Sequence, residues 1–282
     1  MIPTKDMTPH VPITVSEIIE DVHKASEIGI TMVHLHARDA ITGMPTYEKE
    51  IYAEIIAGIR KYAPKLVLCV SLSGRDFKEL EQRSDALFLE DHLKPDMGSL
   101  TLSSLNFNTT ASINSPQMVQ DLARVMKERG IVPELEVFDA GMINYAKYLE
   151  RKDLLQAPYY FNLLFGNIAC AQADILHTGV MINDLPKDSF WSLEGIGNSQ
   201  LKMNSLAIAI GGGVRVGLED NIWYDAARTK LASNSELLER IHIISKANER
   251  EIMTPEEFRI LMNLEPGNGS YGRKYKKYSD DN

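Results

Sequence analysis

Two histidines near the N-terminus are the residues whose type and spacing are best suited to chemistry. His34 and His36 stand two residues apart at the end of an apolar run that begins at Thr31. On a β-strand this spacing places both imidazoles on one face. Neutral imidazole is a good zinc ligand, so the pair is a candidate for part of a metal site. The alternative is two ordinary strand histidines with hydrogen-bond partners.

The candidate for a third ligand is Glu219, which follows the last predicted strand, residues 213–218. In a closed parallel barrel the last strand lies near the first strands. His34, His36 and Glu219 would then form a two-histidine, one-carboxylate set with an open position. This pattern is typical of catalytic zinc, and non-haem iron uses similar ligands. A helix-capping role for Glu219 and its neighbour Asp220 is the simpler alternative.

Other charged groups near these positions are suited to acid–base chemistry. Asp220 directly follows the candidate ligand and is free to act as a base. Arg215 lies four residues before Glu219, on the same face of the predicted strand, where it could hold Asp220 ionised or bind an anion. Glu134 and Glu136 share one face of another predicted strand. In a barrel that face points inward, where an unpaired carboxylate is unfavourable.

Predicted strands and helices alternate along the chain, which indicates right-handed βαβ units and a parallel sheet. The number of predicted strands is close to that of a (β/α)8 barrel, which has about 250 residues and carries its chemistry at the C-terminal ends of the strands. The predicted strands are the one with the histidine pair and residues 66–71, 97–102, 134–138, 159–165, 189–193 and 213–218. The predicted helices are residues 16–28, 47–62, 77–84, 116–130, 144–151, 168–184, 199–210, 236–248 and 255–262.

Composition limits the class of protein. The chain has 282 residues, of which 44% are hydrophobic and 24% charged, and we expect one domain over residues 1–262 with a tail over residues 263–282. The net charge of −9 argues against nucleic acid or anionic membranes as partners. Cys69 and Cys170 are the only cysteines, so no disulfide framework is predicted. Without a signal peptide or long apolar run, a cytoplasmic location is expected.

Several motifs resemble those of the β-keto acid cleavage enzyme family, and the resemblance extends from residue 1 to about residue 262. The most specific motifs are HLHxR at residues 34–38 and RxGxEDN at residues 215–221, which are informative because they occur together. Further matching stretches are Pro12-Ile13-Thr14, Lys94-Pro95-Asp96-Met97, Leu105-Asn106-Phe107, Pro133-Glu134-Leu135-Glu136-Val137-Phe138 and Gly195-Ile196-Gly197.

The resemblance implies a (β/α)8 barrel, usually assembled as a homotetramer, that binds zinc through His34, His36 and Glu219. It implies that a β-keto acid and acetyl-CoA are converted to acetoacetate, or its CoA ester, and a new acyl-CoA by a retro-Claisen route. Asp220 corresponds to the base that forms the enolate and Arg215 to the residue that orients it, with zinc as the Lewis acid at the ketone. The family positions that line the substrate pocket correspond to Ser71, Ser99 and Glu136.

The sequence departs from the family pattern in its N-terminal segment and in two loops. Family members carry a segment upstream of the equivalent of Met1 that forms the first barrel strand. Either Met1 is an internal methionine taken as the start, or that strand is missing here, which would leave two open sheet edges. Ile2 stands where the family has a pocket glutamate, which argues against a substrate with an amino group. Residues 166–168 replace a glycine-rich loop and residues 198–200 replace an Arg-Trp-His run, so contacts to substrate and CoA are expected to differ.

Other protein classes share part of this pattern. Amidohydrolase-type barrels also begin with His-x-His on a strand, but they need histidines at later strand ends, which this sequence does not offer. A metal-dependent aldolase or retro-Claisen hydrolase would act without CoA. A non-catalytic metal-binding paralogue would have no use for Asp220 and Arg215 beside the three ligands. We therefore interpret the chain as a zinc-dependent, homo-oligomeric acyltransferase that acts on a small β-keto acid and acetyl-CoA.

Overall fold

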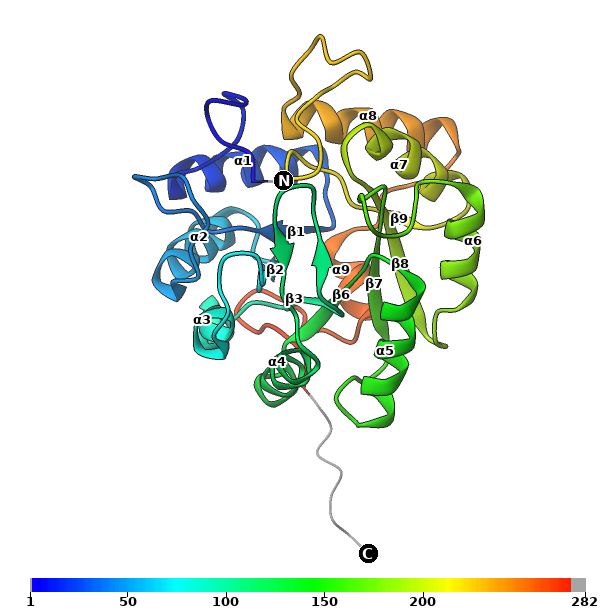
Figure 1. The fold of residues 1–282 in the computed structure, drawn as a ribbon. Helices are drawn as coiled ribbons and strands as arrows, with labels where there is room; N and C mark the ends of the chain where they lie inside the picture. The colour runs from blue at the N-terminus through cyan, green and yellow to red at the C-terminus, as the bar shows by residue number, and fades with distance from the viewer. Residues whose placement is uncertain (1, 275–282) are drawn as a thin grey trace, which may run out of the picture.

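The computed structural model describes residues 2–274, which form a curled parallel sheet with helices on its outer side (Figure 1). Every neighbouring pair of strands in this sheet is parallel. The spatial order of the strands follows the chain. It is β1 (Met32–Leu35), β2 (Val67–Val70), β3 (Met97–Thr101), β6 (Val132–Val137), β7 (Tyr159–Phe165), β8 (Ser189–Gly195) and β9 (Gly213–Val214).

The helices lie around the sheet, mostly between successive strands (Figure 1). Short capping sequences set their limits. The hydroxyls of Thr14, Ser233 and Thr254 each begin a helix through a capping box, and Gly29 and Gly130 end two helices in the left-handed conformation. The α-helices are α1 (Val15–Ile28), α2 (Lys49–Tyr62), α3 (Leu80–Ser84), α4 (Pro116–Arg129), α5 (Ala140–Arg151), α6 (Ile175–Asn183), α7 (Gln200–Ala209), α8 (Asn234–Ala247) and α9 (Pro255–Leu261).

The predicted alternation of strands and helices is confirmed, with differences at the ends of some elements. The helix predicted over residues 168–184 begins only at α6, because the Asp174 side chain accepts from the amide of His177 and caps it there. The strand predicted over residues 213–218 ends at Val214. A two-stranded hairpin of β4 (Leu105–Asn106) and β5 (Ala111–Ser112) was not predicted, because strands this short carry no readable alternation.

The two faces of the sheet have different chemistry. The outer face packs against the helices through buried aliphatic and aromatic side chains, such as Leu35, Leu100 and Phe161. The inner face is apolar near the N-terminal ends of the strands, where α9 lies across the sheet (Figure 1). Side chains on the C-terminal part of the inner face are polar or charged. They include His34, Glu134, Asn162, Ser192, Glu194 and Arg215.

A buried ion pair links the elements at the N-terminal end of the sheet. Arg259 on α9 contacts both carboxylate oxygens of Asp96, at 2.8 and 2.9 Å, and donates to the carbonyl of Leu66. Asp96 in turn accepts from the amides of Leu68 and Gly272. The pair therefore joins β2, the start of β3, α9 and part of the segment after residue 262. The predicted tail beyond residue 274 lies outside the described residues, and the domain boundary stays a prediction.

Strands β1 and β9 lie at the two ends of the strand order, and within residues 2–274 no ladder joins them. The structure thus establishes an α/β fold with a curled sheet, while closure into an eight-stranded barrel stays a prediction. None of the helices in the described part of the chain combines the length and apolar character needed to cross a membrane.

Replacing Arg259 by methionine is expected to lower the free energy of unfolding by about 2–3 kcal/mol, because Asp96 would lose the contacts to both of its oxygens and keep only the more distant cation of Arg60, at 3.7 Å. Urea denaturation followed by circular dichroism measures this change. The matched control is Lys65→Met, which removes a solvent-exposed ion pair to Glu256 and is expected to cost at most about 1 kcal/mol. Equal effects of the two substitutions would contradict the structural role of the buried pair.

Candidate active site

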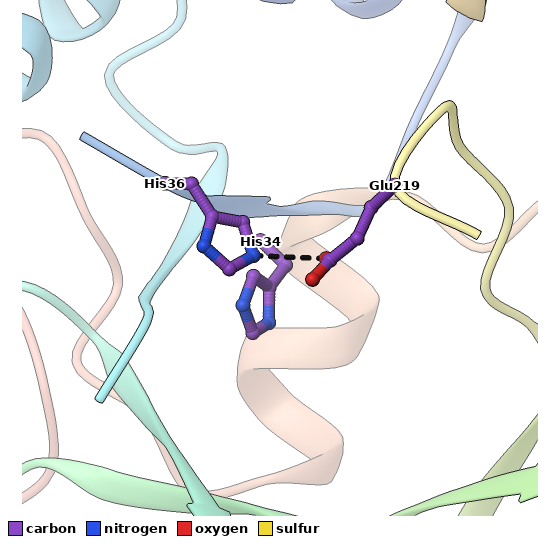
Figure 2. A group of neighbouring side chains, drawn as sticks. All are labelled: His34, His36 and Glu219. Atoms are coloured by element: carbon purple, nitrogen blue, oxygen red, sulfur yellow. Dashed lines mark hydrogen bonds and ion pairs between the residues drawn. The ribbon is translucent and has the colours of Figure 1, made fainter. Parts of the chain in front are cut away.

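The three predicted metal ligands converge at the C-terminal end of the sheet. His34 and His36 project from β1 and the residue that follows it, and Glu219 reaches them from the loop after β9 (Figure 2). His36 Nε2 lies 2.8 Å from Glu219 Oε2, and the two imidazole centroids are 4.9 Å apart. One potential ligand atom from each residue lies within 4.8 Å of the others. This spacing fits a single metal ion.

The surroundings of His34 suit a metal ligand. Its Nδ1 lies 2.6 Å from the buried carboxylate of Glu134, while its Nε2 is buried and has no hydrogen-bond partner within the described residues. A buried polar atom without a partner is unfavourable. A carboxylate on one ring nitrogen fixes the tautomer that leaves the other nitrogen free for a metal. The donor set therefore fits zinc, which binds two histidines and a carboxylate in catalytic sites.

Protonation states at the other two positions also suit a metal. Burial lowers the pKa of the His36 imidazole below its ordinary value, which favours the neutral form that binds metals. Burial alone would raise the pKa of the Glu219 carboxyl, but the neighbouring His36 and the guanidinium groups of Arg75 and Arg215 together hold that pKa well below its usual range. A neutral imidazole and a carboxylate are thus present side by side.

Arg215 is the centre of the charged network on the inner face. Its Nε lies 2.9 Å from Glu194 Oε2. Its Nη1 lies 3.2 Å from Glu134 and 3.0 Å from Glu136, and its Nη2 lies 3.2 Å from Glu219. The prediction placed Arg215 within a regular strand. Instead it follows β9, and the Asn204 side chain bonds its carbonyl oxygen.

Arg75, which the sequence analysis did not single out, contacts the third ligand directly. Its Nη2 lies 2.7 Å from Glu219 Oε1, on the oxygen opposite the one that faces His36. Hydrogen bonds to a ligating carboxylate orient it for the metal. Arg75 lies in the loop after β2, within the sequence Ser-Gly-Arg-Asp. In the sequence alone, such an arginine is indistinguishable from a charged residue exposed to solvent. Only the fold brings it to the site.

Glu194 is a second residue that sequence reasoning missed, and it interacts with the predicted base. Its Oε2 accepts from Asn162 at 2.6 Å. Burial raises the pKa of Glu194 well above its usual range and also raises the pKa of Asp220, whose side chain is hydrogen-bonded to Glu194. The hydrogen bond itself raises the pKa of Glu194 and lowers that of Asp220, which favours the ionised form of Asp220. The available signal was an acidic residue inside a strand that is otherwise largely apolar.

The predicted substrate residues lie in different environments. Ser71 lines the cavity that also contains His36 and Glu219. Glu136 accepts from Thr101 Oγ1 at 2.7 Å and contacts Arg215 at 3.0 Å. The buried hydroxyl of Ser99 accepts from the Leu72 amide at 3.0 Å. Ser99 thus supports the end of β2, whereas Ser71 and Glu136 lie within reach of the charged site.

Residue Ile2, expected at the position of a pocket glutamate, also lines this cavity. The loop residues that replace the family's glycine-rich loop and its Arg-Trp-His run pack together. A Cβ on Gly166 would lie 2.8 Å from Ser199 Oγ, and Gln200 donates to the carbonyl of Gly217 in the loop that carries Glu219. These contacts connect the two loops to the segment that carries Glu219.

Replacing Glu134 by glutamine is expected to weaken zinc binding by roughly 10- to 100-fold, because the carboxylate that orients His34 is lost. Competition with a chromogenic chelator measures the dissociation constant. The matched control is Glu136→Gln, which removes a carboxylate that contacts Arg215 but not His34. Its zinc affinity is expected to stay within a few-fold of wild type. If the Glu134 variant bound zinc as tightly as wild type, the orienting role would be wrong.

Known proteins with similar sequences share most of this chain. The protein is 34% identical over 264 residues to the 3-keto-5-aminohexanoate cleavage enzyme of Fusobacterium nucleatum, and the alignment covers 93% of each chain. It is 35% identical over 269 residues to the 3-oxoadipate:acetyl-CoA acetyltransferase of Cupriavidus necator, covering 93% of this chain and 91% of the relative.

Solved structures support the fold. The apo structure of ObcA superposes with a TM-score of 0.80 at 21% sequence identity, covering 90% of this chain. This chain spans 65% of the length of that protein, so the likeness concerns the fold alone.

The sequence profile of the beta-keto acid cleavage enzymes matches residues 1–264. Together with the relatives above 30% identity, this match shows that the chain belongs to the beta-keto acid cleavage enzyme family.

Proposed function

We propose that this protein is a zinc-dependent acyltransferase that converts a β-keto acid and acetyl-CoA to acetoacetate and a new acyl-CoA. The observation that carries the proposal is the convergence of His34, His36 and Glu219 next to Asp220 and Arg215, in a member of this family. Relatives named as acting with acetyl-CoA support the co-substrate. We also propose a (β/α)8-type barrel and a homo-oligomer, by analogy with the family.

The proposed reaction exchanges the two acyl groups. The carbon between the ketone and the carboxylate loses a proton, and the resulting nucleophile attacks the carbonyl carbon of acetyl-CoA, whose C–S bond breaks and releases CoA thiolate. CoA thiolate then adds to the original ketone carbon, and the bond between that carbon and the nucleophilic carbon breaks. The electron pair of the broken bond returns to the nucleophilic carbon, which takes back the proton that was removed in the first step. The products are acetoacetate and the CoA thioester of the remaining part, so atoms and charge balance.

The residues of the chain have distinct roles in this scheme. Zinc, held by His34, His36 and Glu219, would supply a Lewis acid that stabilises negative charge on the ketone oxygen. Asp220 accepts the proton from the carbon next to the ketone. Arg215 positions Glu219 and the inward-facing carboxylates. Asp220 is buried beside Glu194, which Arg215 contacts, and a general base must lie within hydrogen-bond reach of the proton that it accepts.

The remaining predicted residues act around this centre. Ser71, in the cavity wall, is placed to bind a polar group of the substrate. Glu136 contacts Arg215 on the side of β6 and is proposed to face the substrate there. Ser99 acts indirectly in this proposal, because its hydroxyl holds the Leu72 amide next to Ser71.

Substituting His36 by alanine is expected to remove both zinc and activity, because two ligands bind zinc far more weakly than three. Metal analysis of the purified protein and a coupled assay for new acyl-CoA measure the two effects. Wild type is expected to contain about one zinc per chain. Zinc retained in the His36→Ala protein at the wild-type level would show that the ligand set is wrong.

Substituting Asp220 by asparagine is expected to leave zinc content unchanged and to lower kcat by roughly 100-fold or more, the usual contribution of a general base. The control is Asp225→Asn, which changes a carboxyl in the same loop that bonds only Thr229 and the local backbone. Its kcat is expected to stay near wild type. A near-normal rate for Asp220→Asn would rule out Asp220 as the base.

A further inference from the structure

Arg38 is a buried cation in the wall of the cavity that contains His36 and Glu219. Only 7% of the residue is exposed. Its one hydrogen bond within the described residues runs from Nη1 to the carbonyl of Gly43, at 3.1 Å. No carboxylate in this part of the chain lies within the 4.0 Å of an ion pair. A buried guanidinium without an anion is unfavourable, so the position favours an anionic ligand.

Several other buried arginines already have acceptors for most of their nitrogens, although the buried Nε of Arg60 also has no partner within residues 2–274. Arg215 and Arg259 contact carboxylates. Arg83, which lines the same cavity, has no carboxylate partner in the described residues, but its three nitrogens donate to Leu72, Ile113 and Asn114. The Nε and Nη2 of Arg38 have no such acceptor within residues 2–274. Among the three arginines that line this cavity, Arg38 is therefore the one with nitrogens left for a ligand, since Arg75 contacts Glu219 and Arg83 has its own acceptors.

The charges around the cavity also favour an anion. Its wall contains the guanidinium groups of Arg38, Arg75 and Arg83, against the carboxylates of Asp76 and Glu219. Two arginines already contact Glu219, and a bound divalent cation would add further positive charge. Asp76 is exposed to solvent, where its field is screened. A substrate with a positively charged end would meet repulsion here.

The position of Arg38 indicates which part of the substrate it meets. Arg38 lies two residues beyond His36, which corresponds to about 6.6 Å along an extended chain. In a β-keto acid, one carbon separates the carboxylate from the ketone, so both oxygens can approach the same cation. An anion at Arg38 would then belong to the other side of the ketone. A carboxylate three carbon–carbon bonds from the ketone carbon fits this separation.

We propose that the substrate is a β-keto acid with a second carboxylate at the far end of its acyl part, and that Arg38 binds this carboxylate. Arginine presents a planar pair of donors that matches a carboxylate. The proposal rests on the proposed function, since it names the substrate class of the same site.

The test compares 3-oxoadipate with 3-oxohexanoate, which has the same chain length but no second carboxylate. With the zinc-loaded protein and acetyl-CoA, wild type is expected to prefer 3-oxoadipate by roughly 10- to 100-fold in kcat/KM, the range for a hydrogen bond to a charged group. Arg38→Gln is expected to remove the preference, mainly through a higher KM for 3-oxoadipate. Arg38→Lys is expected to retain part of it. Equal zinc content and thermal unfolding would show that the variants are folded.

Other results would overturn the proposal. Equal kcat/KM values for the two acids with wild type would exclude the substrate class, whatever the variants do. An equal loss for both acids in the variants would place Arg38 at their common carboxylate. A rise only in the KM for acetyl-CoA would place Arg38 at a CoA phosphate.

Failure of the proposed function would look different, because no β-keto acid would give a new acyl-CoA. Calorimetric binding of adipate against hexanoate would then test the subsite alone. At least tenfold tighter binding of adipate, lost in Arg38→Gln, would support the carboxylate subsite, and equal binding would exclude it.

Discussion

The contact of one guanidinium with four carboxylates is the interaction on which the rest of the site depends. Glu134, Glu136, Glu194 and Glu219 come from β6, β8 and the loop after β9, and each lies within ion-pair distance of Arg215. Without this cation, their charges would repel one another in a region largely shielded from water, where Coulomb interactions are strong. Arg215 thus lets strands distant in sequence direct acidic groups toward one point.

One guanidinium does not balance the charge of four carboxylates. The excess negative charge explains other features of the site. Arg75 neutralises Glu219 from its outer side. Burial raises the pKa of Glu194, which favours its neutral form and reduces the negative charge. The buried His34 Nε2 without a partner then lies next to a region that is still acidic. A divalent cation would satisfy the imidazole nitrogen and reduce the excess negative charge together.

Much of this arrangement could be predicted from the sequence, because strand alternation and the His-x-His spacing are local signals. The order of the seven strands in the curled sheet, most helix limits and the meeting of His34, His36 and Glu219 were predicted correctly, whereas the last strand is shorter than predicted. Arg75 was missed because its neighbouring residues do not distinguish it from a solvated charge, and Glu194 was missed because the predicted strand ended one residue before it, whereas β8 continues to Gly195. Residues 215–218 were predicted to continue the last strand, but they form a loop. The side-chain amide of Asn204 bonds the carbonyl oxygens of Leu193 and Arg215 there, in place of a strand-to-strand hydrogen bond.

The buried pair of Arg259 and Asp96 lies at the opposite end of the strands from the charged site. The contacts that attach α9 to the strands are thereby separate from the loops around the charged site. Residues in those loops that contact no metal ligand, such as Ile2 and Ser71 in the cavity wall, can be exchanged with little effect on the attachment of α9 to the strands. This separation gives the scaffold room to diverge: a lineage can acquire a new acyl specificity by changing loop residues while it inherits the same metal centre.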